Sequence, residues 1–265
     1  MSPNWLKQTV KEPLYDSLLW SRPENKQYAG KVVVIGGNLH GFAKTVNSYQ
    51  LLLDAGLGQV TVLLPKPIQK IIGHISPDLI FCPSTDSGSF GSESLDSLLE
   101  YSSSADGVFL SGELSSNSET LIVLEKLVGH TLKPMIITDD SIDLIMHLDI
   151  SLVNRSNMIY VGTLDKIQKL ATRLKSPDPI TSSLALSNLV EILTKFSLEN
   201  KISLATIHQG YAVVASGGRV SSTKIEAGSD QDIFKLVHYC VAWVIQNPDS
   251  KFEALSCAAI TYQTI

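Results

Sequence analysis

The stretch Lys31-Val32-Val33-Val34-Ile35-Gly36-Gly37-Asn38 decides the fold that the sequence predicts. An unbroken apolar run that ends in two glycines is typical of a strand buried on both faces and followed by a tight turn. A helical pattern follows, and then Ala55-Gly56-Leu57-Gly58-Gln59-Val60-Thr61-Val62 supplies a glycine stop and a second strand. A right-handed crossover makes the two strands parallel. The loop after Gly37 is therefore expected to face a helix N-terminus, where α/β sheets bind ligands and anions.

Strands and helical segments continue to alternate along the rest of the chain. This alternation predicts the α/β fold class, as a three-layer α/β/α sandwich with a mainly parallel central sheet. We predict residues 1–30 as a lead-in helix and extension, residues 31–265 as a single domain, and residues 180–198 as a long amphipathic helix. Four apolar runs are expected to be buried neighbours in one parallel sheet: Val32–Ile35, Val60–Leu63, Val108–Leu110 and Met135–Ile137.

Composition limits the classes of partner. The 265 residues are 44% hydrophobic and 18% charged, with a formal net charge of −5, which argues against nucleic acid or an acidic membrane surface. No segment approaches the length of apolar chain that a membrane span needs, so a soluble, cytoplasmic protein is expected. Cys82, Cys240 and Cys257 are far apart in apolar surroundings and are predicted to be reduced core residues. No His/Cys metal spacing is present, so no metal site built from these residues is expected.

Five separated parts of the chain carry a resemblance to one known family. They are Arg22-Pro23 with Tyr28 to Gly37, Ala55 to Val62, Ala105 to Val108 continuing through Glu119-Thr120, Lys133-Pro134 with Asp140, and Phe252-Glu253-Ala254. In this order they are similar to the ATP/ADP-dependent NAD(P)H-hydrate dehydratases, which have the ribokinase-like fold. The resemblance implies a metabolite-repair lyase that removes water from hydrated NAD(P)H at the expense of ATP or ADP, with Mg²⁺ at the nucleotide. We also expect a homo-oligomer with a nucleotide-type small molecule as its ligand.

The resemblance assigns roles to residues at the ends of the predicted strands. The family's Gly-x-Gly-Asp motif corresponds to Ala227-Gly228-Ser229-Asp230-Gln231-Asp232, so Asp232 or Asp230 would be the catalytic aspartate. The residues expected to bind the nucleotide are His208, Gln209, Gly210, Gly228 and Ser229. Those expected to bind the substrate are Asn38, His40, Lys44, Ser115 and Asp140.

These motifs depart from the family pattern, and the departures have chemical consequences. The family's Gly-Pro-Gly-Leu-Gly loop reads Ser111-Gly112-Glu113-Leu114-Ser115, and its Lys-Gly pair reads His208-Gln209. Glycines let backbone N–H groups reach phosphate oxygens, whereas Glu113 brings negative charge to the same loop. We therefore predict that nucleotides bind weakly or not at all.

Several of these residues have ordinary structural alternatives. Asp232 could be an N-cap of the helix that it precedes rather than a catalytic base. Lys44 at a helix start is unfavourable unless it meets an anion, whether a ligand or a carboxylate of the chain. Asp139 and Asp140 could hold Mg²⁺ through water or cap the following helix.

Three functions stay open on the sequence. The first is a diverged NAD(P)H-hydrate dehydratase, and the second is a catalytically inactive homologue with a binding or structural role. The third, a small-molecule kinase, is disfavoured because kinases of this superfamily rely on the missing Gly-x-Gly-Asp motif.

Overall fold

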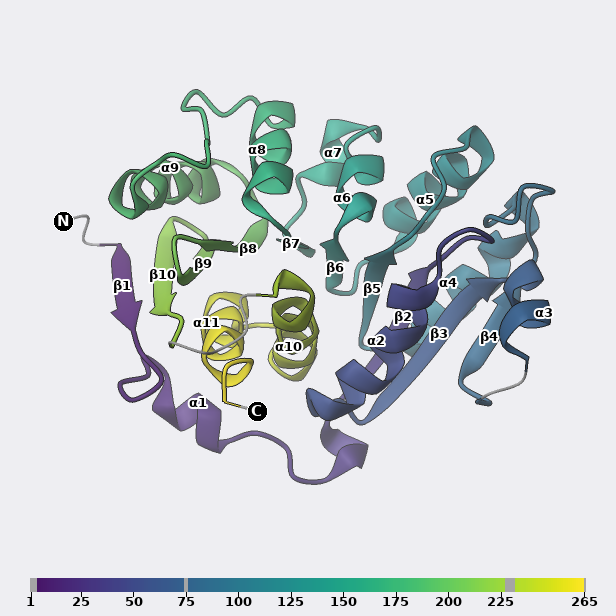
Figure 1. Ribbon diagram of the computed structural model, residues 1–265, viewed down its shortest axis with the longest axis horizontal. Helices are drawn as coiled ribbons and strands as arrows, with labels where there is room; N and C mark the ends of the chain where they lie inside the picture. Colours follow the sequence, from purple (N-terminus) through teal and green to yellow (C-terminus); the bar gives the residue numbers. More distant parts are fainter. Residues whose placement is uncertain (1–3, 74–75, 227–231, 265) are drawn as a thin grey trace.

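The computed structural model describes residues 4–73, 76–226 and 232–264 (Figure 1). Its strands are β1 (Trp5–Gln8), β2 (Lys31–Gly36), β3 (Gln59–Pro65), β4 (Leu79–Cys82), β5 (Gly107–Gly112), β6 (Met135–Thr138), β7 (Met158–Val161), β8 (Ser203–His208), β9 (Tyr211–Ser216) and β10 (Arg219–Lys224). Its α-helices are α1 (Asp16–Trp20), α2 (Ala43–Asp54), α3 (Gln69–Ile72), α4 (Leu95–Ser104), α5 (Ser118–His130), α6 (Asp140–Ile145), α7 (Ile150–Val153), α8 (Leu164–Arg173), α9 (Leu186–Glu199), α10 (Ile233–Gln246) and α11 (Lys251–Thr261).

The strands form one sheet in the order β1-β10-β9-β8-β7-β6-β5-β2-β3-β4. Neighbouring strands from β8 through to β4 are parallel, while β9 pairs antiparallel with both β8 and β10. The four runs predicted to be neighbours occupy the adjacent strands β6, β5, β2 and β3, and their apolar side chains are buried. The predicted architecture is therefore confirmed.

Helices cover both faces of the sheet. Helices α4 to α9 pack over one face around Val33, Leu110 and Tyr160, whereas α2, α10 and α11 pack over the other around Val34 and Phe109 (Figure 1). Successive side chains of a strand point to opposite faces, so a strand covered on both sides must be apolar throughout. This requirement explains why β2 reads as a continuous apolar run.

Two local predictions were wrong. The lead-in contains the short helix α1, but it begins with the strand β1, which was not predicted and which pairs in parallel with β10 at the edge of the sheet. The indole of Trp5 donates to the Ser222 hydroxyl at 2.9 Å, which fixes this pairing. The helix predicted from residue 180 begins at Leu186, because Thr181, Ser182 and Ser183 are poor helix formers and precede it as a turn. The division between residues 1–30 and 31–265 stays a prediction.

The three cysteines are buried and free, as predicted. Burial raises the pKa of Cys82 and of Cys257 to about 12, and it raises the pKa of Cys240 further. Within the described residues no helix is long and apolar enough to cross a membrane.

Candidate functional site

The ends of β2 and β5 meet with almost no space between their backbones. A Cβ on Gly36 would lie 2.4 Å from the Ser111 hydroxyl and 2.7 Å from the Gly112 carbonyl oxygen. Only glycine fits there, so the first glycine of the pair that ends the predicted strand is required by packing. This contact brings the loop after β5 against the first turn of α2.

Glu113 is held in that loop by hydrogen bonds of its backbone N–H, its backbone carbonyl and its carboxylate. Its backbone adopts φ 58°, its N–H donates to Asp140 Oδ1 at 2.8 Å, and its carbonyl accepts from Asn38 Nδ2 at 2.6 Å. Its carboxylate accepts from the backbone N–H of Thr45 at 3.2 Å and from the Thr45 hydroxyl at 3.4 Å. A negative charge of the protein itself therefore lies at the N-terminus of α2, the place where an anionic ligand would be stabilised.

Asn38 and Asp140 were both predicted to bind substrate, but their side chains form hydrogen bonds to the backbone of Glu113 instead. The Asn38 side chain also accepts from the His40 N–H at 2.8 Å, which closes the turn after β2. Burial raises the pKa of the Asp140 carboxyl, against the lowering effect of the Glu113 N–H. The His40 side chain itself is exposed.

A cleft of about 380 Å³ opens beside this loop at the carboxyl edge of the sheet. We call it the carboxyl-edge cleft; it is lined by Lys44, Thr138, Asp139, Gly162, Thr163, Lys166, Asp232, Ile233 and Phe234. It therefore contains two lysines and two aspartates, from the starts of α2, α8 and α10 and the loop after β6. Of the candidate residues expected to converge at the ends of the strands, Lys44 and Asp232 line the cleft, whereas Asn38, His40 and Asp140 do not.

The two lysines of the cleft already have carboxylate partners. Lys44 forms an ion pair with Asp139, and this hydrogen bond is the main reason why the pKa of Lys44 is raised. Lys166 pairs with Asp143, which Lys169 also contacts at 3.0 Å. The anion that a lysine at a helix start needs is thus the carboxylate of Asp139, a residue of the protein itself. Lys166 was not predicted as a site residue, although it too is a lysine in the first turn of a helix, the feature that had singled out Lys44.

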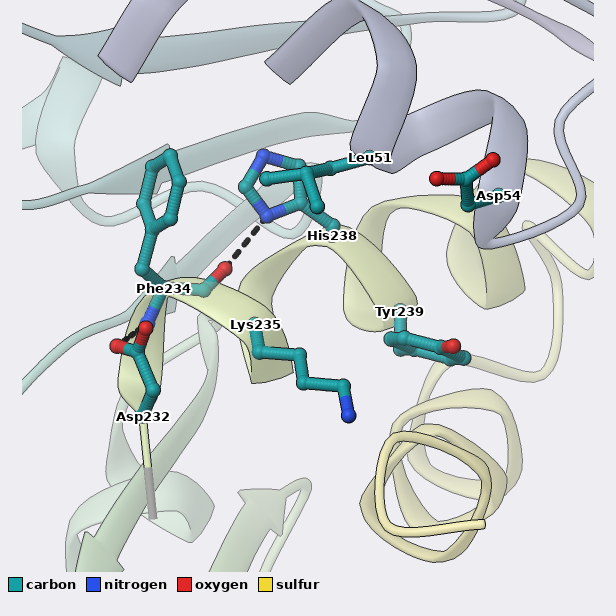
Figure 2. A pocket seen from close by; sticks show the side chains of 7 residues that line it. All are labelled: Leu51, Asp54, Asp232, Phe234, Lys235, His238 and Tyr239. Atoms are coloured by element: carbon teal, nitrogen blue, oxygen red, sulfur yellow. Dashed lines mark hydrogen bonds between the residues drawn. The ribbon is translucent and has the colours of Figure 1, made fainter. Parts of the chain in front are cut away.

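Asp232 is the N-cap of α10, and its Oδ1 accepts from the Phe234 N–H at 2.8 Å (Figure 2). The capping alternative is therefore correct, and a catalytic role for the same carboxylate stays a prediction. Asp230, Gly228 and Ser229 lie outside the described residues.

A second cavity of about 300 Å³ lies between α2 and α10 and shares Asp232 and Phe234 with the cleft. Figure 2 shows Leu51 and Asp54 entering it from α2, with Lys235, His238 and Tyr239 on α10. Burial lowers the pKa of His238 to about 4, so its ring is neutral at pH 7. Its Nδ1–H then donates to the Phe234 carbonyl at 2.5 Å, and Nε2 accepts from the Ser48 hydroxyl at 2.9 Å. His238 therefore joins α10 to α2.

The residues predicted to hold the nucleotide on the β8–β9 hairpin line neither cavity. His208 Nε2 and Gln209 Nε2 donate to the Leu184 carbonyl at 2.7 and 2.9 Å, and they hold the turn before α9 against the hairpin. Gly210 accepts from the Ile225 N–H at 2.9 Å. Ser115 accepts from the Asn117 N–H at 3.3 Å, at the start of α5.

The cleft offers few ligands for a cation. In the described ranges no group of three or more His, Cys, Asp or Glu residues could hold a metal ion. Mg²⁺ keeps most of its water and binds through one or two carboxylates together with phosphates. Asp139 and Asp232 fit that requirement if a nucleotide supplies the phosphates.

Comparison with known proteins shows that this fold is similar to that of ribokinase-like proteins. A ribokinase-like superfamily protein of Enterococcus faecalis V583 superposes with a TM-score of 0.73, at 17% identity, over 100% of this chain and 88% of its own. An ADP/ATP-dependent NAD(P)H-hydrate dehydratase of Bacillus subtilis, co-crystallized with ATP/Mg²⁺, superposes with a TM-score of 0.64 at 9% identity, over 95% and 87% of the two chains. At these identities the likeness shows the fold alone.

One curated protein is similar in sequence. The bifunctional NAD(P)H-hydrate repair enzyme Nnr of Methanothermobacter thermautotrophicus is 30% identical over 125 residues, which are 46% of this chain and 24% of that enzyme. No family model matches the chain. The resemblance to NAD(P)H-hydrate dehydratases is therefore confirmed as a similarity, over about a quarter of the length of that enzyme.

Proposed function

We propose that this chain is a diverged NAD(P)H-hydrate dehydratase whose reaction centre is the carboxyl-edge cleft. The observation that carries the proposal is the position of Asp232. The carboxylate to which the resemblance assigns catalysis stands at the start of α10 and lines the same cleft as Lys44 and Lys166. The sequence similarity to a repair enzyme supports the same substrate, hydrated NAD(P)H.

The side chains of the cleft suit the parts of this reaction. ATP or ADP, when bound, supplies the phosphoryl group that turns the hydroxyl of the hydrated ring into a better leaving group. Lys44 and Lys166 would neutralise the phosphates, and Asp139 would face the Mg²⁺ that accompanies them. Asp232 would accept the proton of the ring hydroxyl as a general base.

A second candidate is a homologue that binds a small molecule without turning it over. The position of the Glu113 carboxylate favours it, because this group meets the first turn of α2 where a ligand's anionic group would be stabilised. Phosphoryl transfer depends mainly on positioned donors, and losing one donor costs about 3 kcal/mol in the transition state. Slow or absent turnover is therefore the expected effect of this carboxylate.

The test is to incubate the purified protein with hydrated NADH and ATP or ADP and to follow the return of NADH by its absorbance. Asp232→Asn is the matched variant, since asparagine caps a helix as well as aspartate but cannot take the proton. A catalytic Asp232 predicts a loss of about 100-fold in rate with an unchanged melting temperature.

Other outcomes separate the two candidates. Equal rates for the wild type and Asp232→Asn would rule out Asp232 as the base. No turnover by the wild type, together with saturable binding of hydrated NADH, would support the non-catalytic candidate. Consumption of ATP that does not depend on hydrated NADH would instead point to a kinase.

A further inference from the structure

The amino edge of the sheet, opposite the carboxyl-edge cleft, carries two adjoining cavities. The first, of about 360 Å³, lies between the end of α4 and the loop that joins α5 to β6. The second, of about 280 Å³, lies beside the residues that precede β7 and β8. Leu132 lines both cavities, so they adjoin across a single side chain. Each approaches or reaches the volume of a small-molecule site.

The first cavity has an apolar wall and an unused hydroxyl. Leu132 is 82% exposed and Leu99 is half-buried, and both line it. Ser102 lines it as well, and its hydroxyl is buried without a hydrogen-bond partner. Ser103 and Ser104, the next two residues of α4, bond the Glu100 and Tyr101 carbonyls instead. A buried hydroxyl without a partner needs an explanation, and a ligand or a water molecule in the cavity provides one.

The second cavity is polar and positively charged. Arg155 and Lys201 line it, while Lys133 lines the first cavity nearby. Arg155 is held in place because its guanidinium donates to the Val128 carbonyl at 2.6 Å and to the Thr131 carbonyl at 2.8 Å. No Asp or Glu is among the residues that line either cavity, although the whole chain has a net charge of −5. Within the described ranges none of these three cations has an ion-pair partner.

We propose that the two cavities form one binding site for a small amphipathic acid, an aliphatic or aromatic carboxylate. Its apolar part packs against Leu99 and Leu132 in the first cavity. Its carboxylate lies toward Arg155 and Lys201, whose charges no acid of the site neutralises. An inorganic anion would make no contact with the exposed side chain of Leu132, and the ammonium group of an amphipathic amine would be repelled by the positive charges of the site. The site is independent of the proposed dehydratase reaction.

Octanoate is the probe, titrated calorimetrically into the full chain. Leu132→Ser removes the apolar wall, and the double variant Lys133→Gln with Lys201→Gln removes charge from exposed side chains without opening the core. Each is expected to weaken octanoate binding about fivefold or more. The matched controls are Leu198→Ser, at another exposed leucine, and Lys11→Gln, and neither should change binding. Thermal melting establishes that each variant is folded.

The ligand class is tested with two analogues that lack one of its parts. Octylamine and inorganic phosphate should each bind at least about tenfold more weakly than octanoate. The proposal is overturned if octanoate shows no saturable binding at millimolar concentration, or if the site variants bind it as tightly as the controls do. Equal affinity for phosphate would show an anion site only, and equal affinity for octylamine would show apolar contact only; either result also overturns it.

Discussion

The carboxylate of Glu113 accepts the backbone N–H of Thr45 at 3.2 Å, across 68 positions of sequence. The first N–H groups of a helix have no partner within the helix, and they attract negative charge. In α2 one of these groups is satisfied by a side chain from the end of the neighbouring strand. An anionic ligand that approached the same turn would have to displace Glu113.

Replacing Glu113 with glycine should therefore open the first turn of α2. Glycine accepts the left-handed backbone at φ 58° without strain, so the loop is expected to keep its shape. We expect the wild type to bind ADP weakly or not at all, and Glu113→Gly to bind it about tenfold more tightly. Calorimetric titration with Mg²⁺ and ADP measures both. Glu113→Gln, which keeps the side chain but not its charge, is the control; micromolar affinity in the wild type would contradict the prediction.

The ion pair between Lys44 and Asp139 should affect binding more than stability. Both side chains are partly exposed, so removing either should change the free energy of unfolding by less than about 1 kcal/mol. Asp139→Asn releases Lys44 and tolerates the positive φ of that residue, so it should tighten the binding of ADP in the absence of Mg²⁺, whereas Lys44→Met should weaken it. Urea denaturation and calorimetry measure the two effects. Changes in the same direction would show that Lys44 does not meet the phosphates.

The buried imidazole of His238 should make stability depend on pH. Its pKa is about 4 in the folded protein and 6.5 ordinarily, so the unfolded chain binds the additional proton between these values. The contribution of His238 to the free energy of unfolding is therefore fully present above its ordinary pKa. As the pH falls toward its pKa in the folded protein, this contribution, about 3 kcal/mol, is lost.

The measurement is urea denaturation over this range of pH, in the wild type and in His238→Gln. Carboxylates with lowered pKa, such as Asp143 and Asp149, contribute in both proteins. The histidine accounts only for the difference between the two pH profiles. Parallel profiles would show that His238 takes up its proton without opening the helix pair α2 and α10.

The three cysteines should be inert until the protein opens. Their raised pKa values and their burial leave no accessible thiolate in the folded state. We expect a chromogenic disulfide reagent at mildly alkaline pH to detect no thiol in the native protein and three in denaturant. Rapid reaction of one thiol in the native state would reveal local opening around that residue.

The sequence predicted the central strands well because their burial on both faces leaves a continuous apolar signal. Val32 to Ile35 and Met135 to Ile137 needed no tertiary information. Strand β1 was missed because its sequence, Trp5 to Gln8, ends in Lys7 and Gln8 and carries no continuous apolar run, and because its partner β10 is distant in the sequence. Its pairing depends on a surface that only the folded sheet provides.

The candidate site was predictable only in part, for a different physical reason. The helix-start positions indicated that Lys44 needed an anionic partner and that Asp232 suited an N-cap. The sequence could not show that Asp139 supplies the partner of Lys44, since several carboxylates follow strands at the same edge. The role of Glu113 likewise depends on the close approach of β2 and β5.

The pairing of β1 with β10 has a consequence for the order of folding. Trp5 lies beside Val220, so these two strands cannot meet until the chain has been synthesised past Val220. Such distant pairings follow local ones, because the loop that they close is long. During synthesis β1 therefore stays unpaired while the centre of the sheet assembles. Until β1 docks, β10 presents unpaired backbone groups at an open edge that other chains can reach. Docking of the first strand would then be a late step of folding, and it would replace the open six-residue edge of β10 with the shorter edge of the four-residue β1.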